Sequence, residues 1–546
     1  MSTHTDPFAD HYESGIPIKN LHKGNLLTSD GGEIEIATRD RLKIAIFQNG
    51  LAFVAREYRW SSEVKAVFDR AFRAGLEINH IHEVDSQRIL EMYQWKGQKQ
   101  AKTSSGFSRI ERQKELKKII ASAASRYASD IHIHVNASLC EVKVRTHGRM
   151  SQLCNLASEE GRAIINAAFA VATDQGSEVS QLGFIKGTLT NQTGLLPSKV
   201  ELIRLQYSPT SGHFAALVMR LKYVSTQVDY SVDRLGFNVR QTSDIKIMCR
   251  RTSGLYLLAG KVSSGKTTTL QCILNAMIAE KNHQISVYSI EEPVELNING
   301  AVHVGIFPKP NQTRSEAFIE AIKATLRSDP NVVLLGELRD RELAGYAMEL
   351  ALTGHALWST VHASSALGIL DRLYDLGIEL WKLTEPSVVR GLIYQRLLGI
   401  MCPDCKITMT EGLSQGQLSS ELVANLHELL NISPNKLFVK GPGCPKCILG
   451  LVGRTVVAET ILPNLKLLGC YEEGNRRAMR DHWLKPINEG GCGCDPIMHH
   501  ALMKVGQGIC DINEVEEEID LVESYKSDFL YHAASIANEL SGENRA

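Results

Sequence analysis

The sequence lacks a net charge, long apolar runs and any segment that resembles an export signal. Its 60 Lys and Arg residues balance 61 Asp and Glu residues to a formal charge of -1, so no general positive field attracts nucleic acid. Its longest apolar stretches, such as 163–172, are too short to cross a bilayer, and its first residues lack the charged and apolar parts of a signal peptide. We therefore expect a cytoplasmic protein without a nucleic-acid partner.

The chain also has no internal repeat and no extended low-complexity tract. Its 43% hydrophobic and 22% charged residues are typical of a folded protein, and 546 residues exceed what one core usually supports. A polar stretch at 97–106 indicates a linker. We expect five parts: an N-terminal α/β domain at 1–105, a second α/β domain at 106–230, a third domain at 231–400, a cysteine-containing module at 401–460 and a helical region at 461–546.

The third domain contains short, uniformly apolar segments separated by longer helical patterns. The clearest are Leu255–Ala259, Ile285–Ile290 and Val332–Leu335. Strands that are buried on both faces have this composition, which is typical of parallel sheets covered by helices. The fold class predicted for the chain is therefore α/β, with several domains.

The first of these strands leads directly into a phosphate-binding loop. Residues 260–267 read GKVSSGKT, which satisfies the P-loop pattern, and a helical pattern follows. Glycines let the backbone close around phosphates, while the helix N-terminus adds a favourable dipole. We expect Lys266 to neutralise the β- and γ-phosphates and Thr267 to place its hydroxyl on Mg²⁺. The expected nucleotide-binding residues are Gly260, Ser263, Ser264, Gly265, Lys266, Thr267 and Thr268.

Acidic residues follow two other apolar strands, where a nucleoside triphosphatase needs carboxylates to hold its metal and orient water. Glu337 ends one strand, and we assign it to the metal and to water positioning. Glu291, Glu292 and Glu295 follow another strand. Three ionised carboxylates cannot lie buried together without strong repulsion, so some must face Mg²⁺, an arginine or water. Which of them activates water stays open.

Two Cys-x-x-Cys pairs lie 42 residues apart, Cys402 with Cys405 and Cys444 with Cys447. Four thiolates in this arrangement suit tetrahedral zinc with no open position, so the expected site is structural. Redox chemistry is the alternative, although nothing nearby indicates a thioredoxin-like unit. A second candidate metal site combines Cys492, Cys494, His499 and His500, and a loop without metal explains that pattern equally well.

The motifs together resemble the hexameric secretion ATPases that power type II secretion and type IV pilus assembly. The resemblance is close over 235–459: after the P-loop come IEEPVE at 290–295, similar to the family's IEDPxE, then a Walker B segment at 329–340, then TGH and STVHA within 353–363. VSS at 262–264 replaces the family's TGS, and Glu292 replaces Asp. The resemblance implies a RecA-like P-loop ATPase core, preceded by α/β N-terminal domains of which the second is PAS-like, and carrying the zinc module of assembly-type members plus C-terminal helices.

The same resemblance implies roles for single residues. His362 would sense the γ-phosphate, although a lone histidine on an apolar strand is usually a core residue. Arg339 and His355 belong to the boxes that the family places near nucleotide. Arg204 and Arg220 are the nearest counterparts of arginines that the second domain supplies to ATP, and surface ion pairs are their alternative reading.

The resemblance further implies a homo-hexamer, peripheral at the inner membrane, that hydrolyses MgATP. Its partners would be a polytopic inner-membrane platform protein and, indirectly, pilin-like subunits. Two other functions stay open: a P-loop motor that acts on DNA, and a nucleotide-gated scaffold with little turnover. Near-neutral charge argues against the first, whereas the departures in the P-loop and at Glu292 favour the second.

Overall fold

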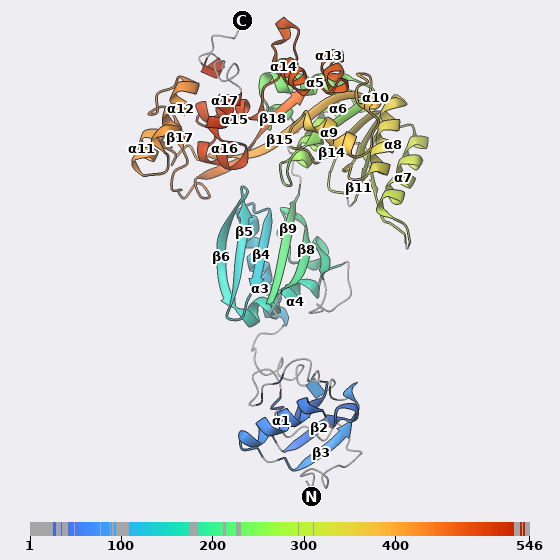
Figure 1. Cartoon of the computed structure of the whole chain (residues 1–546), viewed down its shortest axis with the longest axis vertical. Helices are drawn as coiled ribbons and strands as arrows, with labels where there is room; N and C mark the ends of the chain where they lie inside the picture. The colour runs from blue at the N-terminus through green and yellow to red at the C-terminus, as the bar shows by residue number, and fades with distance from the viewer. Residues whose placement is uncertain are drawn as a thin grey trace, which may run out of the picture. The chain divides into compact units, whose positions relative to one another are not determined.

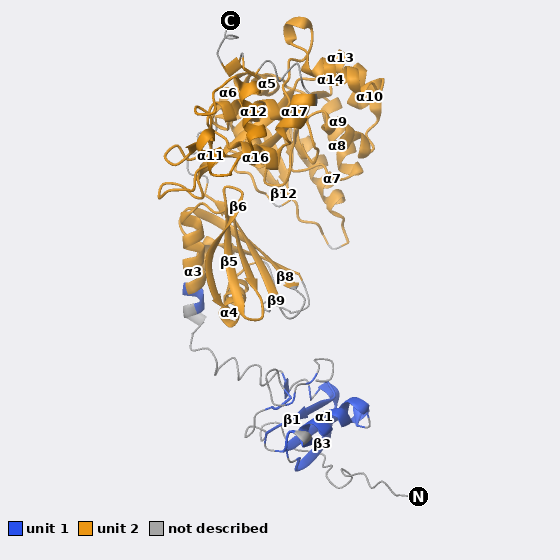
Figure 2. Cartoon of the chain, turned by 60° about the vertical axis from the view of Figure 1, so that its left-hand side comes forward, with its two compact units in different colours: residues 1–114 blue, residues 115–546 orange. Residues whose placement is uncertain are grey.

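The computed structural model describes residues 26–28, 34, 36, 42–93 except 49, 60, 77, 88, 90 and 91, then 109–173, 184–210, 214–224, 231–528 except 293 and 310, and 536, 537, 539 and 540. The linker expected at 97–106 and the domain boundaries expected at 105 and 230 lie outside these residues. The chain divides into two compact units, residues 1–114 and 115–546, which Figure 2 colours separately. Each unit is described by itself.

The smaller unit contains a short mixed sheet in its described part. Strand β2 (Leu51–Ala55) pairs antiparallel with β1 (Ile44–Ile46) and parallel with β3 (His80–Val84). Helix α1 (Ser62–Arg73) provides the crossover between the parallel pair, and Ser61 caps it by accepting from the backbone N–H of Val64. This arrangement agrees with the α/β pattern of the sequence.

The larger unit begins with an antiparallel sheet whose described strands run in the order β6-β5-β4-β9-β8-β7 (Figure 1). Alternate residues of β4, such as Ile131 and Ile133, are buried, which matches the alternation in the sequence. Their buried side chains form one core with those of α3 and α4. The elements are α3 (Arg109–Ser125), β4 (Asp130–Val135), β5 (Leu139–Thr146), β6 (Arg149–Ala157), α4 (Ser158–Phe169), β7 (Ile185–Thr190), β8 (Val200–Thr210) and β9 (Phe214–Tyr223).

The predicted parallel sheet follows, with the described order β12-β11-β13-β14-β10-β15-β18. Figure 1 labels β11, β14, β15 and β18 of this sheet. Every neighbouring pair is parallel except β15 with β18. Because β13, β14 and β10 are adjacent and parallel, their carboxyl ends meet at one edge. The strands are β10 (Gly254–Ala259), β11 (Val287–Glu291), β12 (Ala301–Gly305), β13 (Val332–Leu335), β14 (Ala356–Val361), β15 (Val389–Met401) and β18 (Leu451–Ile461).

Helices cover both faces of this sheet, which explains why its strands are uniformly apolar. Along β10, Leu257 packs on the core that includes α7, α8 and α9, whereas Tyr256 packs on the opposite core with α5 and α6. Tyr256 stacks on Trp358 of β14 with ring centroids 4.6 Å apart. The helices are α5 (Val239–Arg250), α6 (Lys266–Glu280), α7 (Arg314–Thr325), α8 (Arg341–Leu352), α9 (Gly368–Asp375) and α10 (Leu380–Leu383).

The sheet extends past the boundary expected at residue 400. Strand β18 pairs antiparallel with β15, from Leu392 opposite Ile461 to Met401 opposite Leu451. The cysteine-containing module is therefore an insertion between two neighbouring strands. A strand that returns antiparallel after a long insertion leaves no strand-helix-strand pattern in the sequence, which is why the boundary was expected too early.

The inserted module is small, and helices follow the sheet. The module contains β16 (Ile407–Thr408), α11 (Met409–Ser414), α12 (Ser420–Leu430) and β17 (Phe438–Val439). The later helices are α13 (Leu465–Glu472), α14 (Arg476–Leu484), α15 (Ile497–Gly506), α16 (Ile512–Glu518) and α17 (Val522–Asp528). Within the described residues, no helix combines the length and the apolar character that a membrane crossing requires.

Candidate functional site

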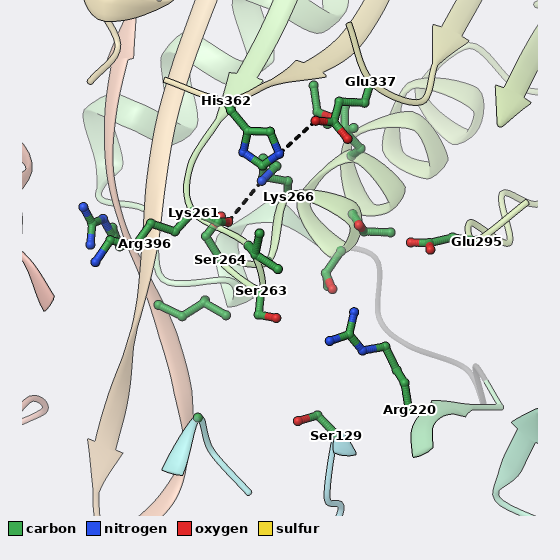
Figure 3. Close-up of a pocket in the computed structure, with 18 of the residues that line it drawn as sticks. Ser129, Arg220, Lys261, Ser263, Ser264, Lys266, Glu295, Glu337, His362 and Arg396 are labelled. Carbon is green, nitrogen blue, oxygen red and sulfur yellow. Dashed lines mark hydrogen bonds and ion pairs between the residues drawn. The ribbon is translucent and has the colours of Figure 1, made fainter. Parts of the chain in front are cut away.

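The loop between β10 and α6 folds around the side chain of Lys266. Helix α6 begins at Lys266, directly after Gly265, whose φ of 84° is left-handed. The Nζ of Lys266 donates to the carbonyl oxygen of Gly260 at 2.8 Å. It also donates to that of Lys261 at 3.1 Å (Figure 3). Burial lowers the pKa of Lys266, and the nearby carboxylate of Glu337 opposes that shift. The ammonium group therefore lies inside the loop and near the acid at the end of β13.

Gln395 of strand β15 contacts this loop through its side chain and its backbone. The side-chain amide of Gln395 donates to the carbonyl oxygen of Ser264 at 2.8 Å. A Cβ on Gly260 would lie 2.4 Å from the carbonyl oxygen of Gln395, so this position requires glycine. The sequence pattern could not identify Gln395, because its contact with the loop depends on the pairing of β10 with β15.

Ser263 departs from ordinary loop geometry. It has a φ of 64°, a left-handed conformation that glycine adopts without strain and that other residues adopt at a cost. The family that the chain resembles has glycine at this place, so the replacement of TGS by VSS puts a strained residue at the centre of the loop.

Glu337 lies at the end of β13, beside the P-loop. Its Oε1 is 2.8 Å from Nε2 of His362, and its Oε2 is 2.7 Å from a guanidinium nitrogen of Arg339. His362 directly follows β14, the strand between β13 and β10. Figure 3 shows the His362 ring pointing toward Glu337, with Lys266 nearby. Three neighbouring strand ends thus bring together an acid, an imidazole and an ammonium group.

Glu291 has a different environment from Glu337. It is buried at the end of β11, where it accepts from the Ser289 hydroxyl at 2.5 Å and from the backbone N–H groups of Glu295 at 3.0 Å and Leu296 at 3.3 Å. These donors occupy both carboxylate oxygens. Glu291 therefore orders the turn that carries the other two glutamates of this segment.

Those other two glutamates pair with arginines, one of the alternatives that mutual repulsion left open. Glu292 forms an ion pair with Arg314 at the start of α7. Glu295 pairs with Arg204 of β8 at 2.6 Å. Arg220 of β9 pairs instead with Asp130 at 2.9 Å. The sequence had not indicated Arg314, because its pairing with Glu292 across 22 residues arises only in the fold.

A cavity of about 950 Å³ joins these groups. The P-loop from Lys261 to Thr268, the acids of β11 and β13, and His362 line it together with Arg220 and other residues of the antiparallel sheet. Among the described residues that line it, nine are Lys or Arg and eight are Asp or Glu. Because these charges nearly cancel, an entering anion must exchange partners with carboxylates already present.

Three of the predicted catalytic and nucleotide-binding residues are not in this cavity lining: Gly260, which lies at the start of the loop, His355 and Arg204. His355 precedes β14 at the amino end of the strand, where its Nδ1 is 3.2 Å from the Thr353 hydroxyl. Parallel strands present their carboxyl ends at the opposite edge, so the structure does not bring His355 to the P-loop. Arg204 contacts Glu295 but is not among the lining residues.

Helix α16 carries a set of acidic cavity residues that the sequence analysis missed. A carboxylate oxygen of Glu518 is 3.7 Å from Nζ of Lys261 and 3.6 Å from Arg396. The neighbouring Glu517 pairs with Arg149 of β6 at 2.8 Å. The run EVEEE at 514–518 is the sequence signal, and only the fold places it beside the P-loop.

The four predicted cysteine ligands converge in the inserted module. Their Sγ atoms all lie within 4.8 Å of one another, and this is the one such group among the described residues. Cys402 and Cys444 have their sulfurs 3.8 Å apart, and Cys405 and Cys447 have theirs 3.7 Å apart. The set could therefore hold a metal ion.

The second candidate metal site does not assemble. The thiol of Cys494 donates to the carbonyl oxygen of Thr460 at 3.2 Å, and His499 contacts Tyr525 and Glu539. The Nδ1 of His500 accepts from the backbone N–H of Ala458 at 3.1 Å. These side chains have separate protein partners, and His499 and His500 lie on helix α15 rather than in a loop.

Comparison with known proteins supports the resemblance noted in the sequence. The family model described as "Type II/IV secretion system protein" matches residues 104–517. The chain is 28% identical over 407 residues to a protein named type II secretion system ATPase E from Vibrio cholerae, covering 74% of each chain. It is also 28% identical over 420 residues to a type IV pilus assembly ATPase PilB from Thermus thermophilus, covering 74% of this chain and 42% of that one.

A solved structure with partial similarity to this chain is also known. The ATPase DotB from Legionella pneumophila has 18% sequence identity and a TM-score of 0.48, with 73% of this chain and 93% of that chain covered. The family match spans the antiparallel sheet, the loop from 260 to 267, the carboxylates that follow β11 and β13, the cysteine module and helix α16 up to residue 517. On that match, the chain belongs to the type II/IV secretion system protein family.

Proposed function

We propose that this chain binds MgATP in the cavity at the carboxyl ends of β10, β13 and β14, and hydrolyses it to drive assembly of a type IV pilus or a type II secretion pseudopilus. The observation that supports this most is the convergence of Lys266, Glu337 and His362 on one cavity from three adjacent strands. Such a set suits phosphoryl transfer, where positioning and charge stabilisation supply most of the rate.

Each group then has a chemical task. Lys266 neutralises the β- and γ-phosphates in place of the carbonyl oxygens it now contacts. The oxygens of Thr267 and Glu337 are the hard ligands that Mg²⁺ prefers, and the ion would offset phosphate charge when bound. Glu337 also orients the attacking water, while His362, 2.8 Å from that acid, holds the carboxylate in place and senses the terminal phosphate. Arg220 and Arg339 line the same cavity and can bind phosphate oxygens.

The ion proposed for the cysteine module is zinc. Tetrahedral zinc with Zn–S bonds of about 2.3 Å separates its sulfurs by about 3.8 Å, close to the spacings in this module. Cys402, Cys405, Cys444 and Cys447 leave no open ligand position, so the ion would stabilise the module rather than take part in hydrolysis.

The proposal includes a homo-hexamer that works at the cytoplasmic face of the inner membrane. Hydrolysis would move the second domain against the P-loop core, and a polytopic platform protein would transmit this motion to pilin-like subunits. The names of the relatives, a type II secretion ATPase and a pilus assembly ATPase, support this choice of task.

The test compares phosphate release by the wild type and by Lys266→Ala, with Mg²⁺ and ATP. We expect turnover in the wild type and its loss in the variant, because the phosphates lose their principal cation. Lys246→Ala, at an exposed lysine of α5 whose nearest acid is Asp233 at 3.6 Å, is the matched control. Equal release by wild type and Lys266→Ala would refute the proposed hydrolysis.

A scaffold that binds nucleotide with little turnover is the second candidate, because Ser263 strains the P-loop at a φ of 64°. Tight ATP binding without phosphate release, even with the membrane partner present, would favour it. A third possibility, a motor on DNA, predicts ATPase activity that DNA stimulates and salt suppresses.

A further inference from the structure

Arg314 is a cation of the cavity to which neither the P-loop nor the other motifs assign a task. It forms an ion pair with Glu292, and its guanidinium carbon lies 4.7 Å from the centre of the Phe318 ring. Both ion-pair partners line the same cavity as Lys266 and Glu337. The Phe318 ring lies against the guanidinium group, and Nε is the atom that binds Glu292, so the ion pair does not use the two terminal nitrogens.

The position of Arg314 is not explained by the helix to which it belongs. Arg314 is the first residue of α7, where the helix dipole disfavours a cation. The helix start is already capped, because the hydroxyl of Thr313 accepts from the backbone N–H of Glu316 and the Glu316 carboxylate accepts from that of Thr313. The helix itself therefore gives no reason for a cation at this position, and the contacts that stabilise Arg314 are those with Glu292 and Phe318.

The Arg314–Glu292 pair can open without disrupting a core. The two side chains are 28% and 30% exposed, so water or a ligand can reach both partners. Glu291, by contrast, is buried and is held by two backbone N–H groups. A planar guanidinium that leaves a carboxylate can bind two oxygens of a phosphate with the same fork of donors.

We propose that Arg314 is a further phosphate-binding residue, and that Glu292 holds it until ATP enters. With ATP bound, the guanidinium group pairs with oxygens of the terminal phosphate, and Glu292 is released toward the metal and the attacking water. This inference rests on the proposed function. In the hydrolysis, a water oxygen bonds to the terminal phosphorus, the bond to the bridging oxygen breaks, ADP leaves with that electron pair, and a carboxylate at the strand ends accepts the water proton.

The first experiment measures the affinity of fluorescent ADP and of a fluorescent non-hydrolysable ATP analogue. For Arg314→Gln we expect the analogue to bind on the order of tenfold more weakly, because a charge-assisted contact to the terminal phosphate is lost. ADP should bind nearly as in the wild type, since it lacks that phosphate. Glu292→Gln should leave analogue binding as tight or tighter, because it removes the competitor for Arg314.

A pair that only supports the fold predicts another pattern. Arg314→Gln and Glu292→Gln would then weaken ADP and the analogue to the same extent, and this outcome overturns the proposal. Arg250→Gln, which breaks the exposed pair of Arg250 with Glu280, is the matched control. If Arg314→Gln does not fold, Arg314→Lys keeps the charge without the fork and should still lose discrimination between the two nucleotides.

The second experiment measures turnover. We expect Arg314→Gln to lower kcat on the order of a hundredfold, because negative charge grows on the phosphoryl oxygens during transfer. Added guanidinium should restore part of the activity of Arg314→Ala. Normal turnover in Arg314→Gln with an active wild type overturns this inference alone, whereas an inactive wild type that still discriminates the two nucleotides overturns only the proposed function.

Discussion

Polar side chains have different partners in two regions of the larger unit. One region is the carboxyl edge of the parallel sheet, and the other is the flank formed by β18, its inserted module and the adjoining helix α15. At the edge, Glu337, Glu292 and Glu295 pair with partly exposed cations. On the flank, four cysteines converge on one point and buried His500 accepts from a backbone N–H. Partners at the edge can be exchanged for a ligand, whereas partners on the flank cannot. The edge is therefore suited to turnover and the flank to stability.

Removing the zinc ion proposed for the module should give the largest effect on stability. A structural zinc ion contributes on the order of 10 kcal/mol or more to the folding of small modules, so Cys405→Ser or a chelator should unfold residues 402–450. Limited proteolysis within this segment measures the effect. Turnover should fall much less, because none of the four cysteines is among the described residues that line the cavity.

Cys470→Ser is the control for this experiment, since Cys470 is a partly buried cysteine outside the set. Zinc content by mass spectrometry should drop in Cys405→Ser and not in Cys470→Ser. A module that stays protease-resistant and metal-free would show that its short elements fold without an ion.

Removing the charge of Glu337 should act in the reverse way, on turnover rather than on folding. In Glu337→Gln we expect kcat to fall on the order of a thousandfold, while nucleotide binding and the melting temperature change little. Phosphate release and fluorescent-nucleotide titration measure the two parts. Loss of binding together with turnover would show that Glu337 holds the loop instead of the attacking water.

A smaller effect is expected from His500, whose protonation should lower the free energy of unfolding at acid pH. Burial lowers the pKa of His500 to about 3, with Lys504 and His499 adding to the shift. The folded state then binds fewer protons than the unfolded state between pH 3 and the ordinary value of 6.5, so stability is lost as the pH falls through this range. Between pH 7 and pH 5 the loss from this residue should be about 2 kcal/mol.

His500→Gln keeps an acceptor for the backbone N–H of Ala458 but does not titrate. Its unfolding midpoint should therefore change less between pH 7 and pH 5 than that of the wild type. His283→Asn, at an exposed histidine, should retain the wild-type dependence. Parallel pH curves for wild type and His500→Gln would show that His500 is not responsible for the acid sensitivity.

The smallest effect concerns the strain at Ser263. Ser263→Gly should relieve on the order of 1 kcal/mol in a loop with a left-handed φ, and should tighten ATP binding several-fold if this strain increases when nucleotide binds. Ser263→Val, with a β-branched side chain, should weaken binding. Titration with the ATP analogue distinguishes them, and equal affinities of Ser263→Gly and the wild type would show that the free and the bound loop carry the same strain.

The sequence predicted the groups whose positions follow from local order. A strand, the GKVSSGKT loop and a helix place Lys266, and an apolar strand places Glu337 at its end. Contacts between segments that are distant in the sequence could not be predicted from local order. The pairing of Arg314 with Glu292, the support of Ser264 by Gln395, and the return of β18 to the sheet depend on tertiary packing, which no local pattern contains.

Helix α16 connects two regions of the larger unit through consecutive residues. Glu517 holds Arg149 of the antiparallel sheet, while Glu518 lies near Lys261 of the loop that precedes α6. A triphosphate that attracted Lys261 would remove one of the two cations near Glu518. A shift of the antiparallel sheet would move Arg149 and, through it, the carboxylate of Glu517. Nucleotide binding and a domain shift would then act on the same turn of α16. This turn would couple binding at the loop to movement of the antiparallel sheet.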